Sequence, residues 1–188
     1  MKRVLKSVLT LGVVALLAAC GNSQSGNTES GDSHEGHNHG TEEHSSTQTS
    51  SPASVNLKDD KLNAVYQHYI HLTTALTNED ATEAKVASAA IEAGAQEIEG
   101  GASIASAAAK ITSAQDLENQ RREYSTLSND FISLVKKSGL NSGELYVDYC
   151  PMALNDEGAY WVSNVKEIKN PYFGEKMLKC GEVKETIN

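Results

Sequence analysis

Apolar residues recur at helical spacing along the middle of the chain, returning every three or four positions from Leu62 onward. Such a stripe lets each helix bury one face against its neighbours. Asn78 or Asp80 is expected to cap the second helix, Ser113 with Asp116 is expected to open the last one, and Gly139 stands where that helix is expected to end. The pattern predicts helices over residues 62–76, 81–99 and 103–111, and a fourth helix that opens at 113–116 and runs to about 137.

The last part of the chain has a different pattern. Residues 145–150 and 159–162 are typical of two paired strands, with a turn at 155–158, and residues 175–180 predict a short helix. Residues 81–110 contain many alanines, whose small side chains let helices pack closely. We therefore expect a mainly α protein: an antiparallel bundle of three to four helices with a small C-terminal β-hairpin and a short helix.

The N-terminus is typical of an exported lipoprotein. Three basic residues precede an apolar run that is too short to span a bilayer, and the run ends in Leu-Ala-Ala-Cys at Cys20. This pattern predicts a signal peptide over residues 1–19, cleavage before Cys20 and lipidation of that cysteine. We expect the protein to be anchored in the bacterial cell envelope, on the outer membrane facing the periplasm.

Composition divides the remainder of the chain. Residues 20–56 are rich in Ser, Thr, Gly, Asn and acidic side chains, so we expect a disordered tether, followed by a folded domain over residues 57–188. The 188-residue chain has 25 acidic and 16 basic side chains and a formal net charge of −9, which argues against a nucleic-acid-binding protein. Arg121 and Arg122 have acidic neighbours and are expected on a solvated helix face. No arrangement of nucleophile and base is recognisable, so we expect no catalytic residues and no enzyme.

Histidines suggest metal chemistry in two places. In the first predicted helix, His68 and His71 are three residues apart and could share a metal ion, although two surface histidines explain the spacing more simply. The tether contains four more, and neutral imidazole is a good ligand for Zn, Ni or Cu(II). A weak, exchangeable site and a solvated linker are both open interpretations. The tether histidines are His34, His37, His39 and His44.

The sulfur-containing residues of the C-terminal part form two close pairs. Cys150 and Met152 would share one side of an extended chain, and Met177 and Cys180 would share one side of a helical turn. If the pairs meet, two thiolates and two thioethers would form a soft site for Cu(I), or less distinctively for Zn. The alternative is a disulfide between Cys150 and Cys180, with both methionines filling the core. Spacing alone favours the disulfide.

Several C-terminal strings resemble the signature of a bacterial envelope domain. It is a domain of unknown function that occurs in lipoproteins and on periplasmic adaptor subunits of heavy-metal efflux pumps. The resemblance covers residues 57–188 and implies a helical bundle with a small C-terminal appendage, associated with copper or other heavy metals. The strings are Cys-Pro-Met-Ala from Cys150, Gly-Ala-Tyr-Trp from Gly158, Ile-Lys-Asn-Pro-Tyr-Phe-Gly-Glu-Lys-Met from Ile168, and Cys-Gly-Glu-Val from Cys180.

The Cys-Pro-Met string is also similar to the core of a small heavy-metal-binding module, which continues with His where this chain has Ala153. With these resemblances, we expect a lipid-anchored envelope protein that binds a soft heavy metal, first of all copper, for metal handling or efflux. Its expected partner is a metal-efflux adaptor or another envelope protein, not nucleic acid. The alternative is a disulfide-stapled structural or interaction module that docks on another envelope protein and binds no metal.

Overall fold

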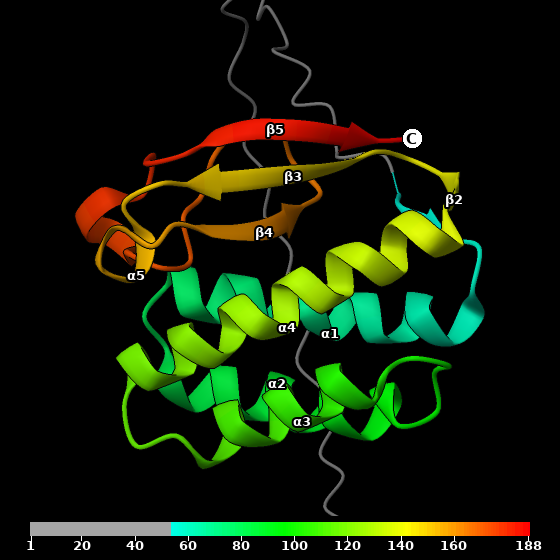
Figure 1. Ribbon diagram of the computed structural model, residues 1–188, viewed down its shortest axis with the longest axis horizontal. Helices are drawn as coiled ribbons and strands as arrows, with labels where there is room; N and C mark the ends of the chain where they lie inside the picture. The colour runs from blue at the N-terminus through cyan, green and yellow to red at the C-terminus, as the bar shows by residue number, and fades with distance from the viewer. Residues whose placement is uncertain (1–53) are drawn as a thin grey trace, which may run out of the picture. The chain divides into compact units, whose positions relative to one another are not determined.

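Residues 54–188 are described by the computed structural model, and within them four long helices form a bundle beside a three-stranded sheet (Figure 1). Figure 1 shows α1 and α4 lying between the sheet on one side and the pair α2 and α3 on the other. The predicted helical bundle with a small C-terminal strand region is confirmed. The helices are α1 (Asp60–Thr77), α2 (Ala81–Ala95), α3 (Ala102–Ser113) and α4 (Leu117–Ser138).

Side-chain caps explain where three of these helices begin. The Asp59 carboxylate accepts a hydrogen bond from Leu62 N at 2.8 Å, at the start of α1. Asp80 accepts from Glu83 N at 2.9 Å at the start of α2, and Asp116 caps α4 in the same way. Each cap satisfies a backbone N–H group that has no partner within its own helix. Local sequence therefore determines these three helix starts.

The second helix is shorter than the sequence pattern predicts. It ends at Ala95, whereas the prediction extended it to residue 99. After Ala95 the chain turns back, and Gly101 lies against the helix end so closely that a Cβ atom at this position would be 2.1 Å from the Ala95 carbonyl oxygen. The tight connection to α3 therefore ends α2 before Gly100 and Gly101 are reached.

The sheet is antiparallel in the order β4-β3-β5. The hairpin of β3 (Leu145–Cys150) and β4 (Ala159–Ser163) agrees with the predicted strands. The predicted helix over 175–180 is instead a single 3₁₀ turn, η1 (Gly174–Met177). Three strands and one short turn in the described part were not predicted: β1 (Asn56–Leu57), β2 (Leu140–Ser142), β5 (Glu182–Ile187) and the turn α5 (Ala153–Asp156).

The core beneath the sheet contains a buried hydroxyl network centred on Tyr69. The Tyr69 hydroxyl accepts a hydrogen bond from Val162 N at 2.9 Å, which ties α1 to β4. It also lies 2.8 Å from Ser128 Oγ, and Tyr124 donates to it at 3.0 Å. Burial raises the pKa of both tyrosines, so the hydroxyls remain protonated and available as donors. The apolar spacing along the first helix did not reveal this network.

Replacing Tyr69 by phenylalanine should lower the free energy of unfolding by about 1–3 kcal/mol, because the buried Val162 N–H loses its acceptor. Urea denaturation followed by circular dichroism measures the change. Tyr146→Phe is the matched control: its hydroxyl bonds Glu144 at the surface, and its loss should cost less than about 0.5 kcal/mol. Equal losses in the two variants would contradict the role of Tyr69.

Within residues 54–188, none of the helices combines the length and the apolar character that a membrane crossing requires.

Candidate metal centre

The structure brings Cys150 and Cys180 together at one end of the sheet. Cys150 is the last residue of β3, and Cys180 stands just before β5, whose residue Glu182 pairs with Tyr149. The two cysteines form a disulfide with their Cα atoms 5.9 Å apart. Their meeting follows from the pairing of β5 with β3, a strand that the sequence pattern did not predict.

The two methionines flank this cysteine pair. Met152 lies two residues after Cys150 and keeps 46% of its surface exposed. Its interpretation as a core filler is therefore wrong. Met177 is partly buried at the end of η1, and its carbonyl oxygen accepts a hydrogen bond from Cys180 N at 2.9 Å. All four sulfur residues thus belong to the two chain segments that meet at the disulfide.

The loop that carries Met152 has an uncommon backbone. Leu154, Asn155 and Asp156 have φ angles of 56°, 60° and 68°, in the left-handed region. Such conformations cost of the order of 1–3 kcal/mol per non-glycine residue and persist where their surroundings hold them. Gly158 closes the loop at φ 79°, and a Cβ atom there would be 2.1 Å from the Tyr149 hydroxyl. The loop after Cys150 is therefore held in one tight shape.

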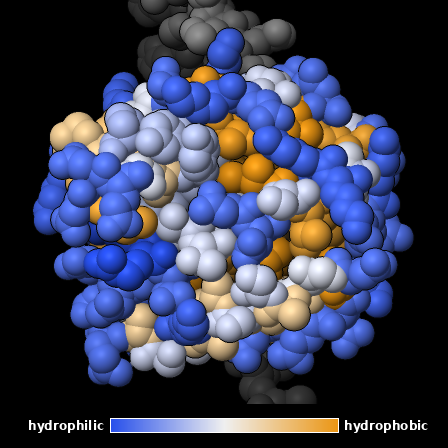
Figure 2. All heavy atoms as spheres, in the orientation of Figure 1, coloured by the Kyte–Doolittle hydropathy of each residue, from blue (hydrophilic) through white to orange (hydrophobic). Residues whose placement is uncertain are grey.

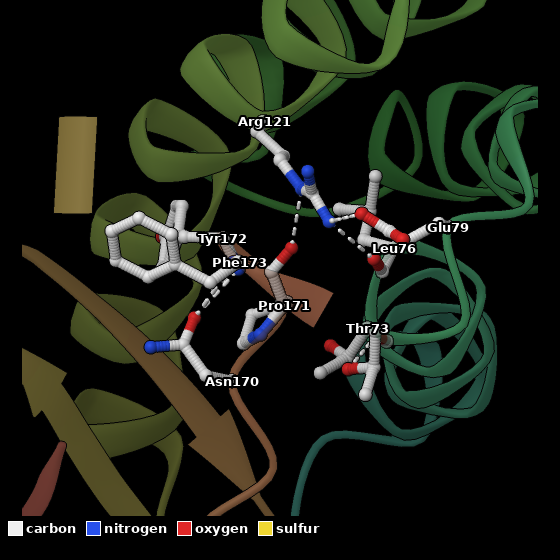
Figure 3. Close-up of polar contacts among 9 residues, drawn as sticks. Thr73, Leu76, Glu79, Arg121, Asn170, Pro171, Tyr172 and Phe173 are labelled. Carbon is white, nitrogen blue, oxygen red and sulfur yellow. Dashed lines mark hydrogen bonds and ion pairs between the residues drawn. The ribbon is translucent and has the colours of Figure 1, made fainter. Parts of the chain in front are cut away.

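The segment that leads to Met177 is fastened to the helices by Arg121 (Figure 3). Arg121 Nε donates to the Pro171 carbonyl oxygen at 2.8 Å, and Nη2 donates to the Leu76 carbonyl oxygen at 3.1 Å. The guanidinium also lies 3.4 Å from a Glu79 carboxylate oxygen. Burial lowers the pKa of Arg121.

The prediction of a solvated face holds for Arg122 and is wrong for Arg121. Arg122 is half-exposed, and its guanidinium lies 3.7 Å from the Glu118 carboxylate. The two arginines are neighbours in sequence, and one helical step of about 100° turns Arg121 toward the loop and Arg122 toward water.

A buried carboxylate lies two positions before Cys150. Asp148 is fully buried on β3, and neither of its carboxylate oxygens has a hydrogen-bond partner among the described residues. Burial without a partner raises the pKa of Asp148 to about 7. Trp161, which pairs with Asp148 across the β3–β4 ladder, also has a buried N–H group without a partner in the described part. The sequence showed Asp148 only as a polar residue within a strand.

The histidines do not join the sulfur residues into one cluster. His68 is exposed on α1, and His71 Nε2 lies 2.9 Å from a carboxylate oxygen of Glu83 on α2, with both side chains nearly half-exposed. In residues 54–188, no group of three or more His, Cys, Asp and Glu side chains is placed to hold a metal ion. The tether histidines and Cys20 lie outside the described residues: His34, His37, His39 and His44.

A separate hollow lies where the sheet meets α4. Figure 2 shows a mostly hydrophilic face with apolar side chains gathered in this area. The hollow has a volume of about 420 Å³ and is lined in part by Ile132, Val147 and Tyr160. Two lysines also line it, and both are ion-paired: Lys136 with Glu185 and Lys184 with Glu182. Apolar and polar residues therefore line it together, and its charged side chains are paired within the described residues.

The comparison with protein families identifies most of the helical region. Residues 65–143 match the family described as a protein of unknown function, DUF3347. The match runs from within α1 to the turn before β3, so it covers most of α1 and all of α2, α3 and α4, while the four sulfur residues follow it in sequence. The comparisons with curated proteins and with solved structures gave no match.

Proposed function

We propose that this protein binds one soft metal ion, Cu(I) in the first place, with Cys150 and Cys180 as thiolates and Met152 and Met177 as thioether ligands. The meeting of the two cysteines, each with a methionine close to it in sequence, carries the proposal. Two cysteines 30 positions apart meet with Cα atoms 5.9 Å apart, and each has a methionine within three residues. Thiolate and thioether sulfur together select soft ions such as Cu(I).

The exposure of Met152 adds to the argument. A methionine that only filled the core would be buried, whereas Met152, two residues after Cys150, is exposed to solvent. The tight left-handed loop after Cys150 holds it there. On such a restrained loop the backbone loses little conformational entropy when a metal ion binds, and the remaining cost is to fix the rotamers of the methionine side chain.

Metal binding requires the reduced form of the cysteine pair. A dithiol reductant would break the Cys150–Cys180 bond, giving two protein thiols and an oxidised reductant. Metal binding would then release the two thiol protons, because the thiolate is the ligand. The disulfide form is thus the metal-free state, and the site is available only under reducing conditions.

The predicted location completes the proposal. With Cys20 lipidated, the protein would handle copper in the bacterial cell envelope, on the outer membrane facing the periplasm. It would act beside a metal-efflux adaptor or another envelope protein. The tether histidines would supply a weaker, exchangeable site for metal capture.

Competition for Cu(I) against a coloured chelator tests the site. The protein is residues 21–188, reduced and kept without oxygen. We expect one Cu(I) per chain, complete loss of this binding in Cys150→Ser, Cys180→Ser, and about tenfold weaker binding, equivalent to about 1.4 kcal/mol, in Met152→Leu or Met177→Leu.

Two controls separate the sulfur site from the histidines. His68→Gln, His71→Gln should keep the Cu(I) affinity, and so should a variant in which the four tether histidines are replaced by asparagine. Binding that survives the loss of both cysteines would refute the proposed site.

The disulfide itself supports a second candidate function. With Cys150 and Cys180 joined, the C-terminal region is a stapled module suited to docking on another envelope protein without a metal. Reduced protein that fails to compete for Cu(I) at micromolar concentration would favour this function.

A further inference from the structure

Asn170 is a fully buried residue in the connection from β4 to β5. Its side-chain Oδ1 accepts hydrogen bonds from Tyr172 N at 2.7 Å and Phe173 N at 3.2 Å, the turn drawn in Figure 3. Its Nδ2 reaches in the other direction and donates to the Cys180 carbonyl oxygen at 2.7 Å. One amide therefore links the start of this loop to the cysteine at its end.

The backbone of Asn170 closes the same loop. Its N–H donates to the Leu178 carbonyl oxygen at 2.8 Å, and its carbonyl oxygen accepts from Gly174 N at 3.1 Å. Met177 and Cys180 both lie within the segment closed in this way. Buried polar groups that are fully hydrogen-bonded fix local geometry, because any displacement leaves a donor or acceptor unpaired.

The chain is held from the opposite side immediately after Cys180. Gly181 has φ 137°, and a Cβ atom there would be 2.9 Å from Trp161 Cη2 and 3.0 Å from the Tyr149 carbonyl oxygen. The backbone around Cys180 is thus confined between Asn170 and the sheet. On the Asn170 side, the contact is the hydrogen bond from the side-chain amide to the Cys180 carbonyl oxygen.

We propose that Asn170 is a positioning residue, which acts through the Cys180 carbonyl group to hold Cys180 and Met177 opposite Cys150. In its metal-binding aspect this inference rests on the proposed function. The positioning of the two cysteines can be measured without any metal, through the equilibrium between the disulfide and the dithiol form.

Asn170→Asp is the principal variant, studied at pH 8. The aspartate keeps an acceptor for Tyr172 N and Phe173 N, and it replaces the donor to Cys180 with an oxygen. Should this variant fold incompletely by circular dichroism, Asn170→Ser replaces it, because a serine hydroxyl also accepts from a nearby N–H but is too short to reach Cys180.

Tyr172→Phe is the matched control. The Tyr172 hydroxyl donates to the Tyr160 carbonyl oxygen at 2.7 Å, so its loss loosens the same loop without touching Cys180. A change that destabilises the disulfide and dithiol forms equally does not shift the equilibrium between them. The control therefore reports the effect of a general loss of stability.

The first measurement is the equilibrium with dithiothreitol, followed by thiol alkylation. We expect Asn170→Asp to shift the equilibrium between disulfide and dithiol about tenfold toward the dithiol form. We also expect the reduced variant to bind Cu(I) about tenfold more weakly, as happens when a supporting hydrogen bond is removed at a metal site. Tyr172→Phe should change each quantity less than about threefold.

The outcomes separate the two proposals. A shifted disulfide equilibrium in a protein that binds no Cu(I) supports the positioning role and refutes the proposed function. A disulfide equilibrium that is the same in Asn170→Asp and Tyr172→Phe refutes the positioning role, whatever the Cu(I) affinity of the unaltered protein.

Discussion

Replacing Asp148 by asparagine should stabilise the protein by about 4 kcal/mol more at pH 8 than at pH 4, which is the largest effect that we expect from one side chain. The carboxyl group is fully buried, and its oxygens have no partner among the described residues. Ionisation therefore places an unpaired charge inside the fold, whereas asparagine stays neutral at every pH. Urea denaturation at a series of pH values measures the difference.

The direction of this pH dependence follows from proton binding. Burial raises the pKa of Asp148 to about 7 in the folded protein, while in the unfolded chain an aspartate titrates near 3.9. Between these values the folded state holds a proton that the unfolded state has released, so stability falls as the pH rises from about 4 to about 7. Below about pH 4 the carboxyl group is protonated in both states, so its ionisation no longer lowers the free energy of unfolding.

Asp156→Asn provides the control for this experiment, since its side chain is exposed in the loop after Cys150. It should leave the pH profile of stability unchanged. A profile for Asp148→Asn that runs parallel to that of the unaltered protein would show that Asp148 titrates as it does in water.

Loss of the Cys150–Cys180 disulfide should lower the free energy of unfolding by about 3–4 kcal/mol. The bond closes a loop with a sequence separation of 30, and the cost comes mainly from the greater freedom that the unfolded chain gains. Urea denaturation of the unaltered protein, with and without a dithiol reductant, measures it. The remaining stability decides how much folded dithiol protein is present to bind a metal ion.

The variant Cys150→Ser, Cys180→Ser is the internal control for this second prediction. It should unfold near the midpoint of the reduced protein and should not respond to the reductant. Equal unfolding midpoints for the oxidised and reduced unaltered protein would show that the bond does not constrain the unfolded chain.

Short-range patterns were sufficient to predict the helices and one hairpin. Asp80 and Asp116 cap the helices they precede, because a capping contact spans only three residues and depends on little beyond them. Gly139 ends α4 with φ 79°, a backbone conformation that glycine adopts without strain. The strands β3 and β4 follow each other along the chain, so their pairing could also be predicted from the sequence.

Contacts between segments that are distant in sequence could not be predicted from such local patterns. The strand β5 is short and polar, with four of its six positions exposed, and it pairs with a strand that precedes it by more than 30 residues. A partly exposed edge strand lacks the alternation of apolar and polar residues by which strands are recognised. The prediction therefore contained a two-stranded hairpin where the protein has a three-stranded sheet.

The sequence by itself determined the helical bundle, the first hairpin and the two sulfur pairs, because each depends on residues close together in the chain. Tertiary structure alone decided that Cys150 meets Cys180, that Asp148 is buried without a partner and that Asn170 reaches Cys180. These facts follow from the path of the chain between β4 and β5. That path is determined by packing against the sheet and by Arg121 on α4, rather than by any local pattern.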